Sequence, residues 1–219
     1  MSETERKPLT RERVLEGAVA LADEIGVEAL TMRKLADALD VKPMTIYHHV
    51  PGKEQIIDGM VDVVFSEIDL PPSDLDWRPA MRVRCISARQ ALNRHWWAAP
   101  LMETRTSPGP VSIMHHDAVI GCLRRGGLSL QMTAHAYAIL DSFIYGFAIQ
   151  EASLPFHGDE PDVPLDELAA GMMEAFPADA YPNFVEFTVE HALQPGYDFG
   201  DSFEVGLDLI LDGLERAIR

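Results

Sequence analysis

Hydrophobic residues recur every three to four positions along almost the whole chain, which predicts helices rather than strands. In the segment 9–25 the apolar positions form one stripe, with Glu and Arg opposite. Thr10 is suited to cap its start and Gly26 to end it. No run alternates with period two long enough to predict a sheet. We therefore expect an all-α protein, with helices over residues 9–25, 31–39, 44–50, 53–68, 77–98, 112–125, 129–153, 165–176, 183–193 and 201–218.

The charge is unevenly distributed along the 219 residues, which carry a formal net charge of −17. Such acidity argues at first against a nucleic-acid partner, since DNA-binding proteins usually have a basic surface. Residues 1–55, however, hold eight basic and ten acidic groups, so −15 of the net charge lies beyond residue 55. Every lysine stands at or before Lys53. A nearly neutral domain can still present one basic face to phosphate. The chain is therefore predicted to have two domains, residues 1–55 and residues 56–219.

Several classes of protein are disfavoured by the sequence. No apolar run approaches the ~20 residues of a membrane-spanning helix. The segment Met1–Thr10 is polar and lacks the apolar core of a signal peptide. Two cysteines, Cys85 and Cys122, are too few for a zinc ribbon or a disulfide framework and indicate buried thiols in a reducing compartment. We expect a cytoplasmic protein.

The segment Thr31–Lys53 has the pattern of a helix-turn-helix, with two short helices joined by about four residues. Ile46 and Val50 are expected to hold the second helix against the first. Lys53 begins the next helix, where free backbone amides favour a phosphate. Helical hairpins are common, so this geometry alone does not establish DNA binding. The opposite face of the second helix carries groups that can bind phosphates or base edges, namely Lys42, Thr45, Tyr47, His48 and His49.

The residues themselves are more specific than the geometry. The run EIGVEALT, then Leu-Ala, then Val-x-Pro-Met-Thr-Ile-Tyr-His-His-Val-x-x-Lys resembles the DNA-binding domain of the tetracycline-repressor (TetR) family of bacterial regulators over about residues 10–58. The resemblance implies that backbone phosphates are held by Thr31, Tyr47, His49 and Lys53. It implies that bases are read by Arg33, Pro43, Met44, Thr45 and His48, and Lys42 could serve in either role. Lys34 is a further candidate DNA contact, because it lies within one turn of the helix start that Thr31 caps. Tyr47 and Met44 have the alternative of simple packing between helices.

The remaining chain resembles the ligand-binding and dimerisation domain of the tetracycline-repressor subgroup, through GGLS at 126–129 and the segment 203–215. A homodimer through the helices 129–153 and 201–218 is expected. The first of these has a stripe of small residues that allows close approach of another helix, namely Ala134, Ala138, Ser142 and Gly146. The last has an apolar stripe of Phe203, Leu207, Ile210, Leu211, Leu214 and Ile218. The alternative is that both stripes belong to the core of one chain.

A mostly apolar ligand pocket is expected in this domain. Its candidate residues, which have ordinary core packing as their alternative, are Trp96, Trp97, Met102, His116, Val119, Leu123, Ile139, Phe143 and Phe147. No metal or cofactor is expected, because adjacent side chains such as His115 and His116 diverge by about 100° on a helix. Ser142 stands where the family has a histidine, so tetracycline itself is not the expected ligand.

These observations predict a homodimeric repressor that binds a palindromic DNA operator and is released by a small hydrophobic effector. Two other readings remain open. An all-α enzyme would use His115 or His116 as a base, but no spacing of nucleophile and base supports it. A protein-interaction adaptor would have a hairpin that no longer touches DNA. We expect no catalytic residues.

Overall fold

The computed structural model divides into two compact units, Met1–Ile149 with Leu207–Arg219 and Gln150–Gly206. Every regular element in its described part is helical, as the periodicity predicts. The helix expected over residues 165–176 lies almost entirely outside that part. The residues that the structure describes are 8–105, 107–154, 171, 176, 179–194 and 196–218.

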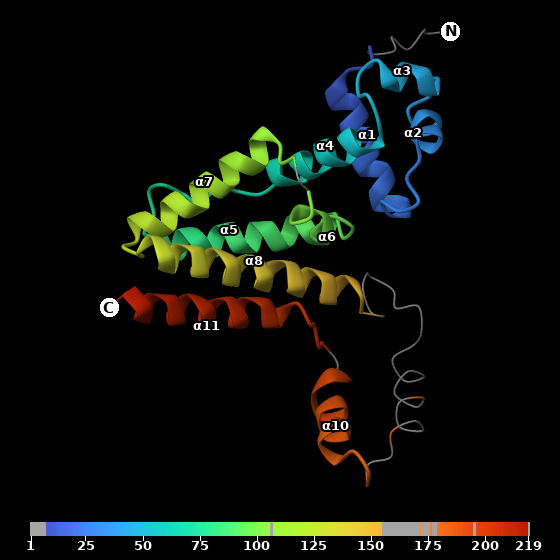
Figure 1. Cartoon of the computed structure of the whole chain (residues 1–219). Helices are drawn as coiled ribbons and strands as arrows, with labels where there is room; N and C mark the ends of the chain where they lie inside the picture. The colour runs from blue at the N-terminus through green and yellow to red at the C-terminus, as the bar shows by residue number, and fades with distance from the viewer. Residues whose placement is uncertain are drawn as a thin grey trace. The chain divides into compact units, whose positions relative to one another are not determined.

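The first unit begins with α1 (Arg11–Ile25) and α2 (Met32–Ala38) (Figure 1). The Arg13 amide donates to the Thr10 hydroxyl at 3.2 Å, which caps α1 as predicted. Gly26 ends α1 at a φ of 78°, a conformation that favours glycine. The boundaries of both helices therefore follow from local sequence chemistry.

A tight turn joins α2 to α3 (Pro43–Tyr47), and Asp40 adopts a φ of 53° within it. Aspartate tolerates this left-handed conformation better than most residues. Pro43 occupies the first turn of α3, where its missing N–H leaves no hydrogen bond unmade. Ile46 and Val50 are buried, which confirms their expected part in holding α3 in place.

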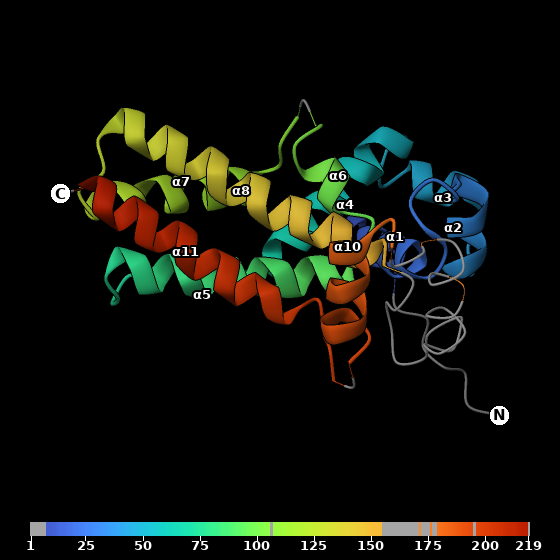
Figure 2. The same cartoon turned by 90° about the horizontal axis from the view of Figure 1, so that it is seen from below.

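The rest of the first unit is a bundle whose helices are tied together by polar contacts. Ser112 at the start of α7 donates its amide to Asp62 of α4 at 2.8 Å. Arg82 of α5 pairs with Asp208 of α11 at 3.1 Å, so these two helices run side by side (Figure 2). The helices of this bundle are α4 (Lys53–Ser66), α5 (Trp77–Arg94), α6 (Ala99–Met102), α7 (Pro110–Arg125), α8 (Leu130–Ala152) and α11 (Asp201–Ile218).

One boundary in the bundle differs from the prediction. A single helix was expected over residues 77–98, but α5 ends at Arg94 and the short α6 follows. Proline inside a helix removes a hydrogen bond and clashes with the preceding turn. The chain therefore leaves the helix at His95, and Pro100 falls in the first turn of the new helix, where proline is tolerated.

The outward faces of α8 and α11 also differ from each other in how well they were predicted. The small-residue stripe of α8 does lie on its outer side: Ala134, Ala138 and Ser142 are exposed and Gly146 is half-buried. The apolar stripe predicted for α11 instead lies mainly inside the protomer, with Phe203, Leu207, Leu211 and Leu214 buried. The outer side of α11 carries Leu209, which is 66% exposed, and the open Gly213.

The second unit contains α10 (Pro182–Phe187), which continues without a break into one π-helical turn, η1 (Thr188–Ala192). One helix was predicted over residues 183–193, so the element was found but its change of winding was not. Aromatic rings pack against one another at tilted angles within this unit, including Phe187 and His191, whose ring centroids are 5.5 Å apart.

Both cysteines are free and buried, which confirms that they are buried thiols. Burial raises the pKa of the Cys85 thiol to about 11. The thiol therefore stays protonated near neutral pH and lacks the thiolate needed for reactivity.

Candidate nucleic-acid interface and sensor cavity

The helix α3 buries one side and exposes the other. Ile46 is completely buried, whereas Met44 is 67% exposed, Tyr47 is 42% exposed and His48 is exposed. Thr45 is half-buried beside them. A five-residue helix cannot be stable by itself, so its exposed side chains are held in place by the buried anchor. The arrangement fits a recognition helix whose free face enters a groove.

The other residues expected to bind DNA lie in α2, in the turn before α3 and at the start of α4. Thr31 caps α2, with its hydroxyl accepting from the Lys34 amide at 3.2 Å. Lys53 opens α4 behind Gly52, which supplies no side-chain cap, so the first amides of α4 have no such partner. None of the expected positions is fully buried: Thr31, Arg33, Lys34, Lys42, Pro43, Met44, Thr45, Tyr47, His48, His49 and Lys53.

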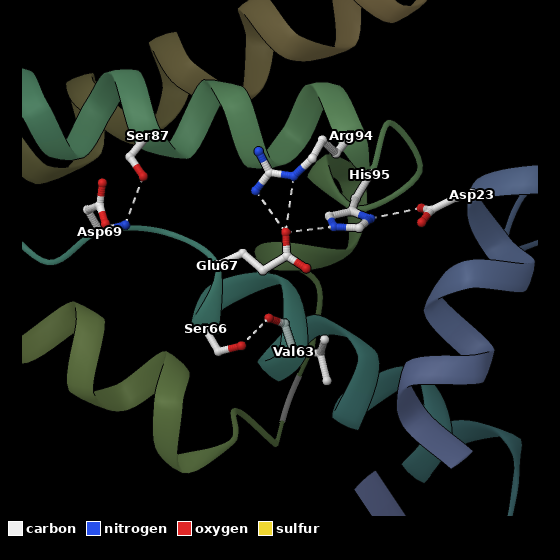
Figure 3. A network of polar contacts seen from close by, with 8 residues as sticks. All are labelled: Asp23, Val63, Ser66, Glu67, Asp69, Ser87, Arg94 and His95. Carbon is white, nitrogen blue, oxygen red and sulfur yellow. Dashed lines mark hydrogen bonds and ion pairs between the residues drawn. The ribbon is translucent and has the colours of Figure 1, made fainter. Parts of the chain in front are cut away.

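A polar network links α1 to the ends of α4 and α5 (Figure 3). The buried His95 lies between two carboxylates, with Nδ1 2.8 Å from Asp23 and Nε2 3.1 Å from Glu67. Arg94 donates two hydrogen bonds to the same oxygen of Glu67, at 3.1 and 2.8 Å. Burial opposes ionisation of Glu67, but the hydrogen bonds from Arg94 and His95 prevail and lower its pKa. Asp23 also accepts from the Trp97 indole at 2.7 Å, so α1 is joined to the segment after α5.

Replacing His95 with alanine is expected to lower the free energy of unfolding by about 1.5–3 kcal/mol, because Asp23 loses a hydrogen-bond partner and Glu67 loses an ion-pair contact. In a chain of this size the melting temperature should then fall by about 3–12 °C, which a thermal unfolding curve measures. Arg94→Ala is the matched control, since its side chain is 52% exposed and its ion pair is worth about 0–1 kcal/mol. Equal effects of the two substitutions would show that His95 does not join these helices.

A partly enclosed cavity of about 130 Å³ lies among α4, α6 and α7. Arg105, on its wall, contacts Asp58 at 2.6 Å and Glu54 at 2.9 Å, and both carboxylates belong to α4. Glu54 directly follows Lys53, so the cavity wall is linked by one arginine to the start of α4. The cavity is lined by Asp58, Val61, Met102, Glu103, Arg105, Ser107, Pro108, Gly109, Ser112 and His116.

The residues expected to line a ligand pocket are dispersed. Only Met102 and His116 line the cavity just described. Trp96 and Trp97 both donate to Asp23 of α1, and Ile139 is exposed on α8. The others are Val119 and Leu123, which are buried in α7, and Phe143 and Phe147, whose ring centroids are 5.8 Å apart.

Sequence reasoning missed the charged residues that connect the helices. Asp23, His95 and Arg105 come from separate segments, and no local pattern pairs them. The one available signal was the break before Pro100, which predicts that the chain changes direction near His95. No three His, Cys, Asp or Glu side chains gather as a metal site in the part of the chain that the structure describes. None of the helices described there is long and apolar enough to span a membrane.

Comparison with known proteins places these features in a family. Residues 14–60 match the model for bacterial regulatory proteins of the tetR family. Residues 70–218, more than half of the chain, match the model for the tetracyclin repressor-like C-terminal domain.

Individual relatives agree with the family models. An HTH-type transcriptional regulator of Saccharopolyspora erythraea is 34% identical over 156 residues, which cover 70% of this chain and 66% of the relative. The HTH-type transcriptional repressor DrrR1 of Streptomyces coeruleorubidus is 29% identical, over 96% of this chain and 78% of its own. The structure of ActR from Streptomyces coelicolor in complex with actinorhodin matches with a TM-score of 0.75 and 28% identity, over 97% of this chain and 99% of that one. The chain therefore belongs to the TetR family of ligand-responsive transcriptional repressors.

Proposed function

We propose that this repressor binds a palindromic DNA operator as a homodimer through α3 and releases it when a small hydrophobic effector binds the C-terminal domain. The observation that carries the proposal is the division of α3 into a buried anchor and an exposed face. In a symmetric dimer, two such helices about 34 Å apart would read two half-sites of one operator.

The proposed roles of the DNA-binding residues follow their positions. Tyr47, His49, Lys53 and the helix start at Thr31 position the protein on phosphates, which carry no sequence information. Base edges are read from α2 and α3, by Arg33, Met44, Thr45, His48 and, through van der Waals contact alone, Pro43. Lys34 and Lys42 are exposed and add electrostatic attraction.

We place the domain boundary near residue 55, which gives a DNA-binding domain of residues 1–55 and a ligand-binding and dimerisation domain of residues 56–219. The two family matches end and begin at residues 60 and 70, which supports a boundary in this part of the chain. The helix α4 runs through this boundary and so connects the two domains. Almost all the net negative charge then belongs to the larger domain, away from DNA.

The proposed dimer forms through α8 and α11. The exposed small residues of α8 permit close approach of a partner helix, and Leu209 of α11 supplies an apolar contact. None of the exposed side chains of α8 between Ala134 and Gly146 is an Asp, Glu, Lys or Arg, as is usual at the core of an interface.

The effector is proposed to enter the cavity lined by Met102 and His116. The other predicted contacts are retained as proposals for the surrounding wall, and tetracycline is not the proposed ligand. A molecule that moves Arg105 also acts on Asp58 and Glu54, and so on the start of α4. Differential affinity of about 3 kcal/mol for the state that does not fit the operator would weaken DNA binding roughly 150-fold.

We further propose that the protein is not an enzyme and works in the bacterial cytoplasm, on the nucleoid while it is bound to its operator. Of the two candidate bases of the enzyme alternative, His115 is buried. His116 lines the cavity, but its Nδ1 is hydrogen-bonded to the Tyr137 hydroxyl. Turnover of a small hydrophobic molecule by the purified protein would favour the alternative.

The proposal is tested by the different effects of Tyr47→Ala and Thr45→Ala on binding to the DNA beside the gene. Tyr47→Ala should weaken binding to all operator variants alike, because it removes a phosphate contact. Thr45→Ala should relax the preference at one base pair by about 1–3 kcal/mol. Mobility-shift titrations on single-base operator variants measure both. Identical profiles would refute the assignment of roles, and failure of the unaltered protein to bind any palindrome would refute the function.

A further inference from the structure

A buried charged pair joins α5 to α8 in the core of the first unit. Arg84 is 1% exposed and Asp141 is 5% exposed. Their single contact joins Arg84 Nη1 to Asp141 Oδ1 at 3.4 Å. A guanidinium and a carboxylate usually pair through two parallel hydrogen bonds. Here only one long contact is made, so the second hydrogen bond of such a pair is missing.

Four buried polar atoms around this pair have no hydrogen-bond partner among the described residues: Arg84 Nε, Asp141 Oδ2, the Tyr145 hydroxyl and His115 Nδ1. Each such group costs about 1–3 kcal/mol when it is left unpaired. Replacing a buried ion pair with well-packed hydrophobic residues of similar volume is often neutral or stabilising. A cluster of unpaired groups in one place therefore needs an explanation other than stability.

The charges of the cluster cancel. Burial raises the pKa of the Tyr145 hydroxyl, which stays protonated and able to donate. Burial and the nearby Arg84 lower the pKa of His115, so its imidazole is neutral near pH 7. Burial raises the pKa of Asp141, but the Arg84 guanidinium beside it opposes the rise, so the pair is counted as one guanidinium and one carboxylate. An additional charge brought into this site would be buried without a partner, so a ligand that fits must be uncharged.

A series of side-chain contacts connects the pair with the cavity. His116 lines the cavity and its Nδ1 hydrogen-bonds the Tyr137 hydroxyl. Tyr137 lies one helical turn before Asp141 and its hydroxyl interacts with that carboxylate. The Phe65 ring packs beside both histidines, with ring centroids 5.7 and 5.8 Å from those of His115 and His116. The contacts between the cavity and the pair are therefore polar, with an aromatic ring beside the two histidines, and aromatic faces pack well against planar rings.

We propose that Arg84 and Asp141 form a receptor for a flat, uncharged effector that carries a hydrogen-bond acceptor and a donor on adjacent atoms, as a lactam does. This inference rests on the proposed function and names the chemistry of its effector. The ligand carbonyl accepts from Arg84 Nε, and its N–H donates to Asp141 Oδ2. Both bonds satisfy atoms that the pair leaves without a partner. The effector reaches these atoms from the cavity when Tyr137 turns away from His116.

The test uses 2-quinolone, an uncharged lactam, and its N-methyl derivative, which has nearly the same shape but no donor. At saturating concentration 2-quinolone should raise the melting temperature of the full-length protein by at least about 2 °C. N-methylation should weaken binding about tenfold to a hundredfold, because a hydrogen bond to a charged group is lost. Equal affinities of the two compounds, or no stabilisation by 2-quinolone, would overturn the proposal.

The variant Arg84→Met with Asp141→Leu separates recognition from folding. It replaces both charges with apolar groups of similar size, a change that is often neutral or stabilising. It should fold and bind the operator but lose the preference for 2-quinolone over its N-methyl derivative. If it keeps that preference, the pair is not the receptor. If operator binding is absent in the unaltered protein, the proposed function fails instead, so the two failures are distinguishable.

Discussion

Leu209→Glu is expected to convert the dimer into monomers and to weaken operator binding by roughly 10²–10⁴-fold. The leucine is 66% exposed on the outer side of α11, where a charge would be buried against the partner. A dimer holds two recognition helices on one operator, and the second half-site then binds as part of the same molecule. A monomer loses this gain entirely, although each α3 remains intact.

Sedimentation velocity and operator titration on the same samples measure the two effects. Leu75→Glu is the matched control, because Leu75 is also an exposed leucine but precedes α5 and belongs to neither α8 nor α11. The control should stay dimeric and bind DNA normally. A Leu209→Glu protein that remains dimeric would place the interface elsewhere.

Asp141→Ala is expected to lower the free energy of unfolding by about 3–5 kcal/mol, since it leaves the Arg84 guanidinium buried without its counter-charge. Combining Arg84→Met with Asp141→Leu should recover most of this loss. The recovery would show that the cost lies in the uncompensated charge, because the double variant removes more polar contacts than the single one does.

Chemical denaturation of the single and double variants measures the difference. Asp117→Ala provides the control, as that carboxylate is exposed on α7 and its loss should change stability by no more than about 0.5 kcal/mol. A loss of less than about 1 kcal/mol for Asp141→Ala would mean that water reaches Arg84.

The sequence was sufficient wherever structure is decided locally. The caps at Thr10 and Thr31, the stop at Gly26 and the bounds of α11 all follow from neighbouring residues. The exposed face of α3 could be predicted for the same reason. Within α3 only Ile46 is buried, so the other side chains of this helix are left at least partly exposed. Local periodicity and capping chemistry thus gave the fold class and the arrangement of the DNA-binding module.

Contacts between distant segments could not be predicted in this way. The pairs His95–Asp23 and Arg84–Asp141 join residues that are 72 and 57 positions apart. Hydrophobic periodicity shows which side of a helix is buried but not which charge lies opposite it. For the same reason it could not assign the stripe of α11, whose buried side packs within the protomer while Leu209 faces outward.

The helix α4 also acts as a lever. It spans 14 residues, or about 21 Å, with Lys53 at one end and the network of Glu67 just beyond the other. A tilt of about 5° around that far end would displace Lys53 by about 1.8 Å, because arc length is angle times radius. Hydrogen bonds tolerate only a few tenths of an ångström, so such a tilt is enough to break a phosphate contact. In a two-fold symmetric dimer the partner undergoes the same displacement. A movement as small as a side-chain rotation at the far end of α4 can therefore change the distance between the two DNA-binding modules.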